Sequence, residues 1–381
     1  MRPVHRSFAR RWTVPASVAA LLVLAAHPLM SQATVSGVAY GQYQYALAKD
    51  TLTADSAIQH INNFDITRAY VNVIGRLAGG ITARVTTDIF TNGAIPGSRI
   101  IRLKYAYVAW NPGTSPLTYK IGAIHTPWVD WEENLWDYRM QGTIAMERGS
   151  PVTGISYLSS SDFGLGVDGK FNNDRFNFQA GLYNGENYNG ALSDQHKDVM
   201  ARASYRLMAT DDGTRVGGLR LTAYGQYGTP GTGGTRQRYI GMISYRSVDI
   251  LAAAEYAMTR DSIHGGPTAA GGGGVITAVP ERSGSVISLY GTFHPHGTRF
   301  TALGRVDLVD PQTDSTLAAG PGTNDKTTRI IAGIAYQLTP NVRLLGNVDL
   351  VSYESNFVPN ATQYAAWAAR QSAYFQVMFT Y

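Results

Sequence analysis

The last nine residues of the chain alternate between apolar and more polar side chains. The apolar positions, counted back from the C-terminus, are Tyr381, Phe379, Val377, Phe375 and Ala373. A period of two is that of a β-strand with one apolar face and one more polar face. A C-terminal strand that ends in an aromatic residue is typical of transmembrane β-barrels, and the buried last strand of a soluble β-sandwich is the alternative.

The same alternation recurs along the chain and predicts 16 strands. Their connections alternate between short and long, and short turns at one end with longer loops at the other are typical of a membrane barrel. An even count of antiparallel strands also allows the barrel to close. The predicted strands span residues 35–47, 63–77, 81–90, 101–111, 117–125, 162–171, 176–184, 197–207, 219–228, 237–246, 248–259, 284–294, 298–309, 327–338, 342–352 and 371–381.

The two faces of the strands support a membrane barrel over a soluble sandwich. Along 81–89 the odd positions are apolar or Thr, whereas the even positions carry Thr82, Arg84, Thr86 and Asp88. We expect the apolar face to meet lipid and the charged face to line the interior. A barrel of this strand number encloses a lumen too wide for side chains to fill. The predicted fold is an all-β, 16-stranded antiparallel transmembrane β-barrel.

The N-terminal segment has the pattern of a cleaved export signal. Arg2, Arg6, Arg10 and Arg11 precede a short apolar run, and Ser31-Gln32-Ala33 offers small residues at a cleavage site. We therefore predict a secretory signal peptide over 1–33 and the barrel over 34–381. Removing this basic segment reduces the formal charge of +5 to near +1, which gives no indication of nucleic-acid binding. The absence of Cys excludes disulfides and thiolate metal sites.

Several segments occur in an order known from one protein family. They read FDITRAYVNVIGRL (64–77), LKYAYVAW (103–110), YKIGAIHTPWVDWEEN (119–134), and GVDGKF with FQAGLYNGENYN (within 166–189). In this the chain resembles the phosphate-selective porins O and P. The resemblance implies a 16-stranded outer-membrane porin, trimeric, with one loop folded into the barrel. His125 stands where the family has a lysine, and the residues after it are acidic, so phosphate selectivity is not carried over.

The longest connection, 126–161, is the predicted constriction loop with an inward fold, because loops of this length are usually functional. Three of the six Trp of the chain lie within nine residues of it. An external loop with interfacial aromatic residues is the alternative. The candidate residues of the constriction are His125, Trp128, Asp130, Trp131, Glu132, Glu133, Trp136, Asp137 and Arg139.

Strand parity places a surplus of basic residues on the inner face of the barrel. A positive wall concentrates anions, and opposite an acidic loop it would create a field across the channel. Alternatively, several of these side chains pair with neighbouring acids or anchor the loop. The predicted pore-lining basic residues are Arg68, Arg76, Arg84, Arg102, Lys104, Lys120, Arg202, Arg220, Arg305 and Arg343.

These features predict passive diffusion of small hydrophilic solutes and ions, with a weak anion preference. A channel specific for organic or inorganic anions, or for sugars sliding along the loop Trp residues, is the first alternative. A barrel enzyme using His125 beside Thr126 is the second; catalytic, metal or cofactor motifs are absent, so we expect no enzyme and no cofactor. The expected partners are outer-membrane lipid, solutes, two further copies of the chain, and the barrel-assembly machinery through Phe379 and Tyr381.

Overall fold

The computed structural model describes most of the predicted barrel. The described residues are 33–47, 62–91, 98–152, 154, 156–188, 190, 195–230, 233–264, 266–267, 275–276, 279–313, 325–354 and 371–381. Residues 1–32 of the expected signal peptide lie outside them, and Ala33 is the first residue of the first strand.

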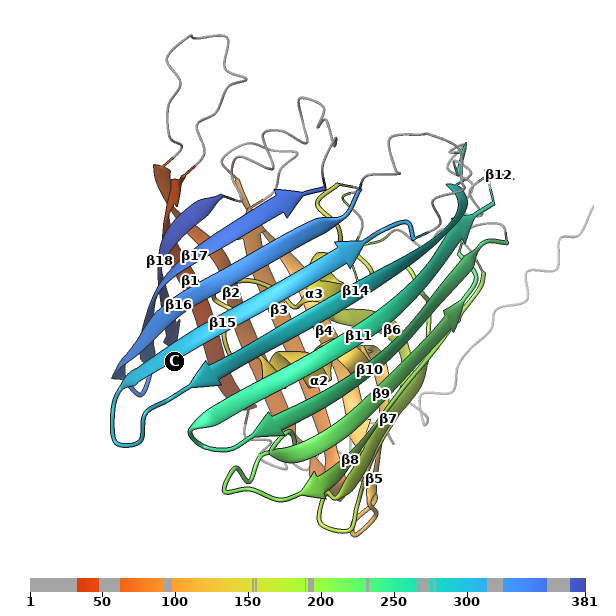
Figure 1. Ribbon diagram of the computed structural model, residues 1–381. Helices are drawn as coiled ribbons and strands as arrows, with labels where there is room; N and C mark the ends of the chain where they lie inside the picture. Colours follow the sequence, from red (N-terminus) through yellow and green to blue (C-terminus); the bar gives the residue numbers. More distant parts are fainter. Residues whose placement is uncertain are drawn as a thin grey trace, which may run out of the picture.

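The described chain forms a closed barrel of 16 antiparallel strands, which confirms the predicted fold class (Figure 1). Each barrel strand pairs with its neighbours in sequence, and β1 pairs with β18 to close the ring. β12 (Gly266–Pro267) and β13 (Val275–Ile276) form a separate two-stranded sheet between β11 and β14. The barrel strands are β1 (Ala33–Ala46), β2 (Asn62–Arg76), β3 (Ile81–Thr91), β4 (Arg99–Trp110), β5 (Leu117–His125), β6 (Ser161–Phe171), β7 (Phe176–Tyr183), β8 (Asp198–Met208), β9 (Gly218–Gly228), β10 (Thr235–Arg246), β11 (Ile250–Ile263), β14 (Val279–Phe293), β15 (Phe300–Asp310), β16 (Thr327–Thr339), β17 (Val342–Tyr353) and β18 (Ser372–Thr380).

Each strand presents apolar side chains outward, in the alternation expected from the sequence. On β18, Phe375 and Phe379 are 51% and 45% exposed, whereas Gln376 between them is buried. On β10, Tyr239 and Ile243 are exposed. An apolar outer wall on a closed sheet is the arrangement that a lipid bilayer requires, because no backbone group is left without a partner.

The short connections lie at one end of the barrel and the long ones at the other, as predicted. The turn between β6 and β7 contains Asn172, Asn173 and Asp174, all with positive φ. Asn and Asp tolerate this conformation better than other side chains with a Cβ, which explains the tight turn. The C-terminal Tyr381 lies near the short-turn end, since β18 reaches the turn at Asn341.

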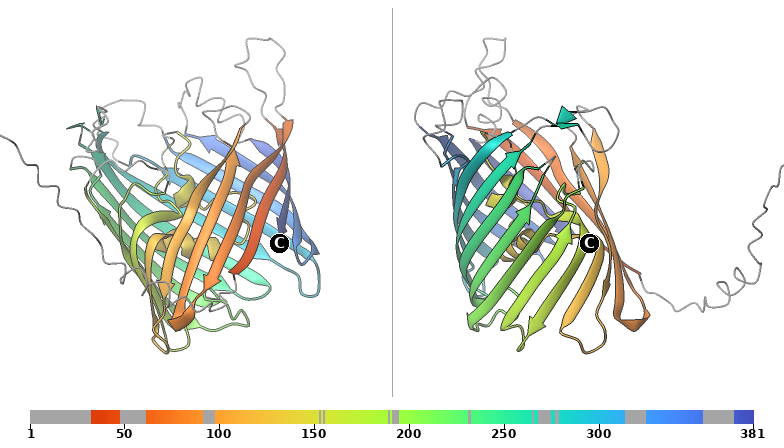
Figure 2. Two further views of the ribbon diagram at one scale, coloured as in Figure 1. Left: turned by 180° about the vertical axis from the view of Figure 1, so that it is seen from behind. Right: turned by 90° about the vertical axis from the view of Figure 1, so that its right-hand side faces the viewer.

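Two helices lie in the connection between β5 and β6, and a one-turn 3-10 helix, η1 (Ala78–Gly80), joins β2 to β3. Figures 1 and 2 show α2 (Pro127–Leu135) and α3 (Ala145–Arg148) within the ring of strands. None of the helices among the described residues is long and apolar enough to cross a membrane.

Candidate functional site: the segment within the barrel

The segment 126–160 begins with a helix that the local sequence specifies. Pro127 occupies the first turn of α2, where its missing N–H costs no hydrogen bond. Trp128, Val129, Trp131 and Leu135 are all fully buried. The indole Nε1 of Trp128 donates to Glu132 Oε2 at 2.8 Å, one helical turn later. α2 therefore packs its apolar residues inside the molecule although it belongs to a connection between strands.

The C-terminus of α2 is held by a wall residue. Arg246, at the end of β10, donates through Nη1 to the carbonyl oxygens of Asn134 at 2.7 Å and Leu135 at 3.2 Å. These carbonyls belong to the last turn of the helix, where no intrahelical donor is available and positive charge is favoured. Arg246 is itself oriented by Asp212, whose Oδ2 accepts from Nε at 2.7 Å.

The stretch after α2 is bound by strands from another part of the ring. Arg305 of β15 donates to the Thr143 carbonyl at 3.0 Å, and Gln376 of β18 donates to the Met140 carbonyl at 2.7 Å. Arg343 of β17 contacts the carboxylate of Asp137 at 3.2 Å. β10, β15, β17 and β18 lie in the half of the ring opposite β5, so segment 126–160, which follows β5, reaches across the interior to that half of the wall. The alternation of side chains along the strands does not predict that Arg246 and Gln376 donate to backbone carbonyls of segment 126–160.

Six of the ten predicted wall cations form ion pairs with described carboxylates. Asp88 pairs with both Arg68 and Arg102, so two guanidinium groups share one carboxylate. Arg305 is nearly fully buried and pairs with Asp307. The pairs and their N–O distances are Arg68–Asp88 2.7 Å, Arg102–Asp88 2.8 Å, Lys120–Asp168, Arg220–Asp174 3.7 Å, Arg305–Asp307 2.8 Å and Arg343–Asp137 3.2 Å.

Three of the other four cations contact neutral polar or aromatic groups. Arg84 donates to Asn72 Oδ1 at 2.9 Å and lies over the ring of Tyr105. The ammonium group of Lys104 lies 4.7 Å from the ring centroid of Tyr70. Arg202 donates to Asn177 at 2.6 Å and lies over the ring of Trp131. For Arg76, at the end of β2, no contact defines a role. That all ten line a pore stays a prediction, and Lys104, Arg202, Arg220 and Arg305 are buried.

The acidic residues of the segment other than Glu132 are also ion-paired. Asp130 accepts from Arg215, in the turn before β9, at 2.9 Å. Arg139 pairs with both Glu133 and Glu147. Burial alone would raise the pKa of Asp130, but the charge and hydrogen bond of Arg215 hold it below the ordinary value. Burial likewise opposes the charge of Arg139, and Glu147 raises the pKa of that guanidinium.

The three Trp residues of the segment are not available to a solute. Trp128 and Trp131 have no exposed surface, and Trp136 is 1% exposed. The ring of Trp136 packs edge-on against Tyr290 at a centroid distance of 5.3 Å. An aromatic slide for sugars, one of the sequence-based alternatives, is therefore wrong for this arrangement, because burial in the packed segment removes the rings from the solvent.

His125 is enclosed by aromatic side chains at the end of β5. Its ring stacks on Tyr105 at a centroid distance of 3.9 Å, and its Nε2 lies 3.4 Å from Arg84 Nη1 and 4.0 Å from Asp130 Oδ1. The neighbouring hydroxyl of Thr126 donates to the Ser159 carbonyl instead. His125 and Thr126 therefore form no nucleophile–base pair in this arrangement. Among the described residues, no group of three or more His, Cys, Asp or Glu side chains could hold a metal ion.

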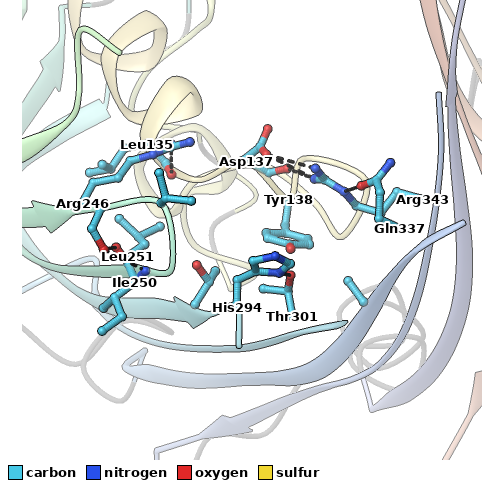
Figure 3. Close-up of a pocket in the computed structure, with 14 residues that line it drawn as sticks. Leu135, Asp137, Tyr138, Arg246, Ile250, Leu251, His294, Thr301, Gln337 and Arg343 are labelled. Atoms are coloured by element: carbon cyan, nitrogen blue, oxygen red, sulfur yellow. Dashed lines mark hydrogen bonds and ion pairs between the residues drawn. The ribbon is translucent and has the colours of Figure 1, made fainter. Parts of the chain in front are cut away.

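A cavity lies on each side of the segment. At the long-loop end a cavity of about 520 Å³ is lined by residues that include Arg68, Arg102, Tyr157 and Arg238. At the short-turn end a cavity of about 220 Å³ lies below α2. Figure 3 shows its polar groups converging, with Arg343 bonded to Asp137, Tyr138 above His294, and Arg246 beside Leu135; the residues drawn also include Ile250, Leu251, Thr301 and Gln337.

Comparison with known proteins gives the fold a clear counterpart. No family model and no curated protein matches the chain. Among solved structures, an anion-selective porin from Comamonas acidovorans is similar at 13% identity and a TM-score of 0.58, over 92% of this chain and 98% of that one. Salmonella typhi OmpF, solved as a complex with daunomycin, is similar at 13% identity and 0.61, over 92% and 98%. OmpT of Vibrio cholerae, in a trimer form, is similar at 10% identity and 0.55, over 92% and 99%.

These likenesses establish the architecture of the chain. The resemblance to the phosphate-selective porins O and P is not confirmed by any of them. The closed ring of 16 strands and its apolar outer wall are features of outer-membrane β-barrels. The chain therefore has the fold of an outer-membrane barrel that is shared by bacterial porins.

Proposed function

We propose that this chain is an outer-membrane porin that allows small hydrophilic solutes and ions to diffuse passively. The observation that carries the proposal is the polarity of the two walls: apolar side chains face outward, whereas charged and amide side chains face inward. In a bilayer this arrangement isolates a polar interior from lipid. The bacterial porins with the same fold support the proposal.

The segment 126–160 sets the width of the proposed channel. A ring of 16 strands is too wide to be filled by its own side chains. The anchors at Arg246, Arg305 and Gln376 fix the segment against the wall at three places. The cavities on its two sides then serve as the outer and inner entrances of the pathway. In this interpretation 126–161 is the constriction loop that the sequence predicts.

A weak anion preference follows from the charges on β2, β3 and β4. On these strands, Arg68, Arg84, Arg102 and Lys104 outnumber the described carboxylates near them: Asp88 pairs with Arg68 and Arg102, and Glu147 of α3, which is already paired with Arg139, lies near Lys104 and Arg68. Elsewhere most wall cations are neutralised by neighbouring acids. The potential is therefore positive on one side of the interior, and the preference for anions is modest rather than strict.

The same proposal covers the assembly and the absence of catalysis. A homotrimer is the proposed state, in line with the trimer form of the Vibrio cholerae protein. Phe379 and Tyr381, which are 45% and 60% exposed, are proposed to be recognised by the barrel-assembly machinery. We propose no enzymatic role, because His125 is enclosed by Tyr105 and Tyr107 and the Thr126 hydroxyl donates to the Ser159 carbonyl rather than to the imidazole.

Purified protein in a planar lipid bilayer tests the proposal. We expect stepwise increases of current as single channels insert, and a reversal potential in a KCl gradient that shows a slight excess of anion permeability. A folded protein that inserts without any current would contradict the channel. A reversal potential that shows cation preference would contradict only the selectivity. Liposome swelling with sugars, amino acids and organic anions would then define the solute range.

A further inference from the structure

Two glutamate side chains meet between α2 and the barrel wall. Glu132 of α2 has no exposed surface and Glu255 of β11 is 2% exposed. Their carboxyl groups lie within hydrogen-bonding reach of one another. Trp128 donates to Glu132 Oε2, but Glu132 Oε1 and both carboxyl oxygens of Glu255 have no donor among the described residues. Buried acceptors without a donor are rare and call for an explanation.

Arg305 of β15 is the cation that acts on the pair, and Asp307 offsets part of its charge. Its Nε donates to Asp307 Oδ1 at 2.8 Å and its Nη1 donates to the Thr143 carbonyl at 3.0 Å, whereas its Nη2 has no acceptor among the described residues. One guanidinium already paired with Asp307 does not balance two further carboxylates. The other groups that face the pair are the hydroxyl of Tyr290 on β14, which also has no described partner, and two residues opposite Glu255: Met242 on β10 and Ser288 on β14, whose hydroxyl donates to Asp307.

Two ionised carboxylates in this position would repel one another in a medium of low dielectric constant. A proton between them turns the repulsion into a hydrogen bond and supplies the missing donor. We propose that Glu132 and Glu255 share one proton, and that this shared proton is a pH-sensitive latch that fastens α2 to β11. The effect on conduction rests on the proposed function, whereas the latch itself does not.

The raised pKa of Glu132 also supports a proton shared with Glu255. Burial raises the pKa of Glu132 from 4.5 to about 7. An acid with a raised pKa in the docked state binds more protons there than in the undocked state. The contribution of the shared proton to docking is therefore greatest below pH 4.5 and is lost as the pH rises through about 7. Over this range the ratio of docked to undocked α2 falls by up to roughly tenfold per pH unit.

Fluorescence can follow the latch without any measurement of current. Three of the six Trp lie on or beside α2, and replacing Trp110 and Trp367 by Phe makes these three dominate the emission of the mature chain. We expect the emission to shift to the red between about pH 5 and about pH 8, because undocking exposes buried indoles to water. In Glu132→Gln and Glu255→Gln an amide N–H replaces the shared proton, so the emission should stay blue at both values.

Glu133→Gln is the matched control. Glu133 is the next residue on α2 but pairs with Arg139, so its variant should keep the pH dependence of the parent. An emission that does not change with pH in the parent would overturn the latch. So would a pH dependence that persists unchanged in both Glu132→Gln and Glu255→Gln. If the protein carries no current but shows the expected shift, the channel fails and the latch stands; current noise that rises between the same pH values would link the two.

Discussion

The backbones of Gly37 and Tyr381 exchange two hydrogen bonds, Gly37 N to Tyr381 O at 2.9 Å and Tyr381 N to Gly37 O at 3.1 Å. The aromatic ring of Tyr381 lies directly over Gly37, where an added Cβ would come within 2.2 Å of Cζ. The last residue of the chain thus extends the β1–β18 seam beyond β18. With the terminal ring in this position, there is no space for a side chain at residue 37 of β1.

Replacing Gly37 by Ala should weaken the seam slightly. The new methyl group would overlap the Tyr381 ring, and because this terminal ring is 60% exposed it can move aside at a cost below about 1 kcal/mol. Deleting Tyr381 should also lower the yield of folded protein by removing two seam hydrogen bonds, while channels that do form keep their conductance. The folded fraction can be measured by the change in electrophoretic mobility on heating. Gly346→Ala is the control, because no atom lies within 4 Å of its added Cβ.

Arg246→Ala should loosen segment 126–160. The variant leaves the carbonyls of Asn134 and Leu135 and the carboxylate of Asp212 without their donor. These acceptors are exposed or partly buried, so water can replace the lost donor and the net cost is about 0.5–1.5 kcal/mol; we expect faster proteolysis within the segment of the folded barrel. Arg260→Ala is the control, since Arg260 is exposed and pairs with Glu281 far from α2. Equal cleavage rates in both variants would show that Arg246 does not hold the helix.

Asp88→Asn should make the proposed channel more selective for anions. Asn keeps the size of the side chain but removes the carboxylate that Arg68 and Arg102 share. The positive potential on β2–β4 then increases. The reversal potential in a KCl gradient should move further toward the anion value than in the parent. Asp65→Asn, whose partner Arg99 lies at the start of β4, is the matched control and should move it less. A reversal potential that moves toward the cation value would contradict the proposed positive potential on β2–β4.

The strands could be predicted from the sequence because their signal is local. Alternation with period two identifies a strand such as 342–352 without knowledge of any other, and the structure places β17 at Val342–Tyr353. The lengths of the connections likewise fix which end of the barrel carries the turns. A bulge between Thr86 and Thr87 changes the register of β3 against β4, which alternation alone does not show.

The contacts of segment 126–160 depend on residues far apart in sequence, which local patterns do not specify. Gln376 and Met140 are 236 residues apart, and Arg246 and Asn134 are 112 apart. Strand parity places Arg305 on the inner wall, but it does not predict that Arg305 pairs with Asp307 on the same strand. For the same reason the spacing of Trp128, Trp131 and Trp136 does not decide whether these side chains pack inside the protein or face solutes. The structure shows that all three are buried.

Acid should weaken the docking of α2, in the direction opposite to the effect of the Glu132–Glu255 latch. Burial opposes the charge of Asp130, but Arg215 holds its pKa below the ordinary value of 3.8. A carboxylate with a lowered pKa stabilises the docked state above its ordinary pKa, and that stability is lost as the pH falls below it. The Trp emission should therefore shift to the red below about pH 3.8.

Asp130→Asn isolates this effect. The amide cannot ionise, so the variant should dock more weakly than the parent at neutral pH and should change less when the pH falls. Asp211→Asn is the control, because Asp211 is exposed and accepts a hydrogen bond from the Val248 backbone rather than from a residue of the segment. An acid-induced shift of equal size in the parent and in Asp130→Asn would assign it to other carboxylates of the segment, such as Glu147. In that case the Arg139–Glu147 ion pair within the segment, rather than the Asp130–Arg215 pair, would carry the sensitivity to acid.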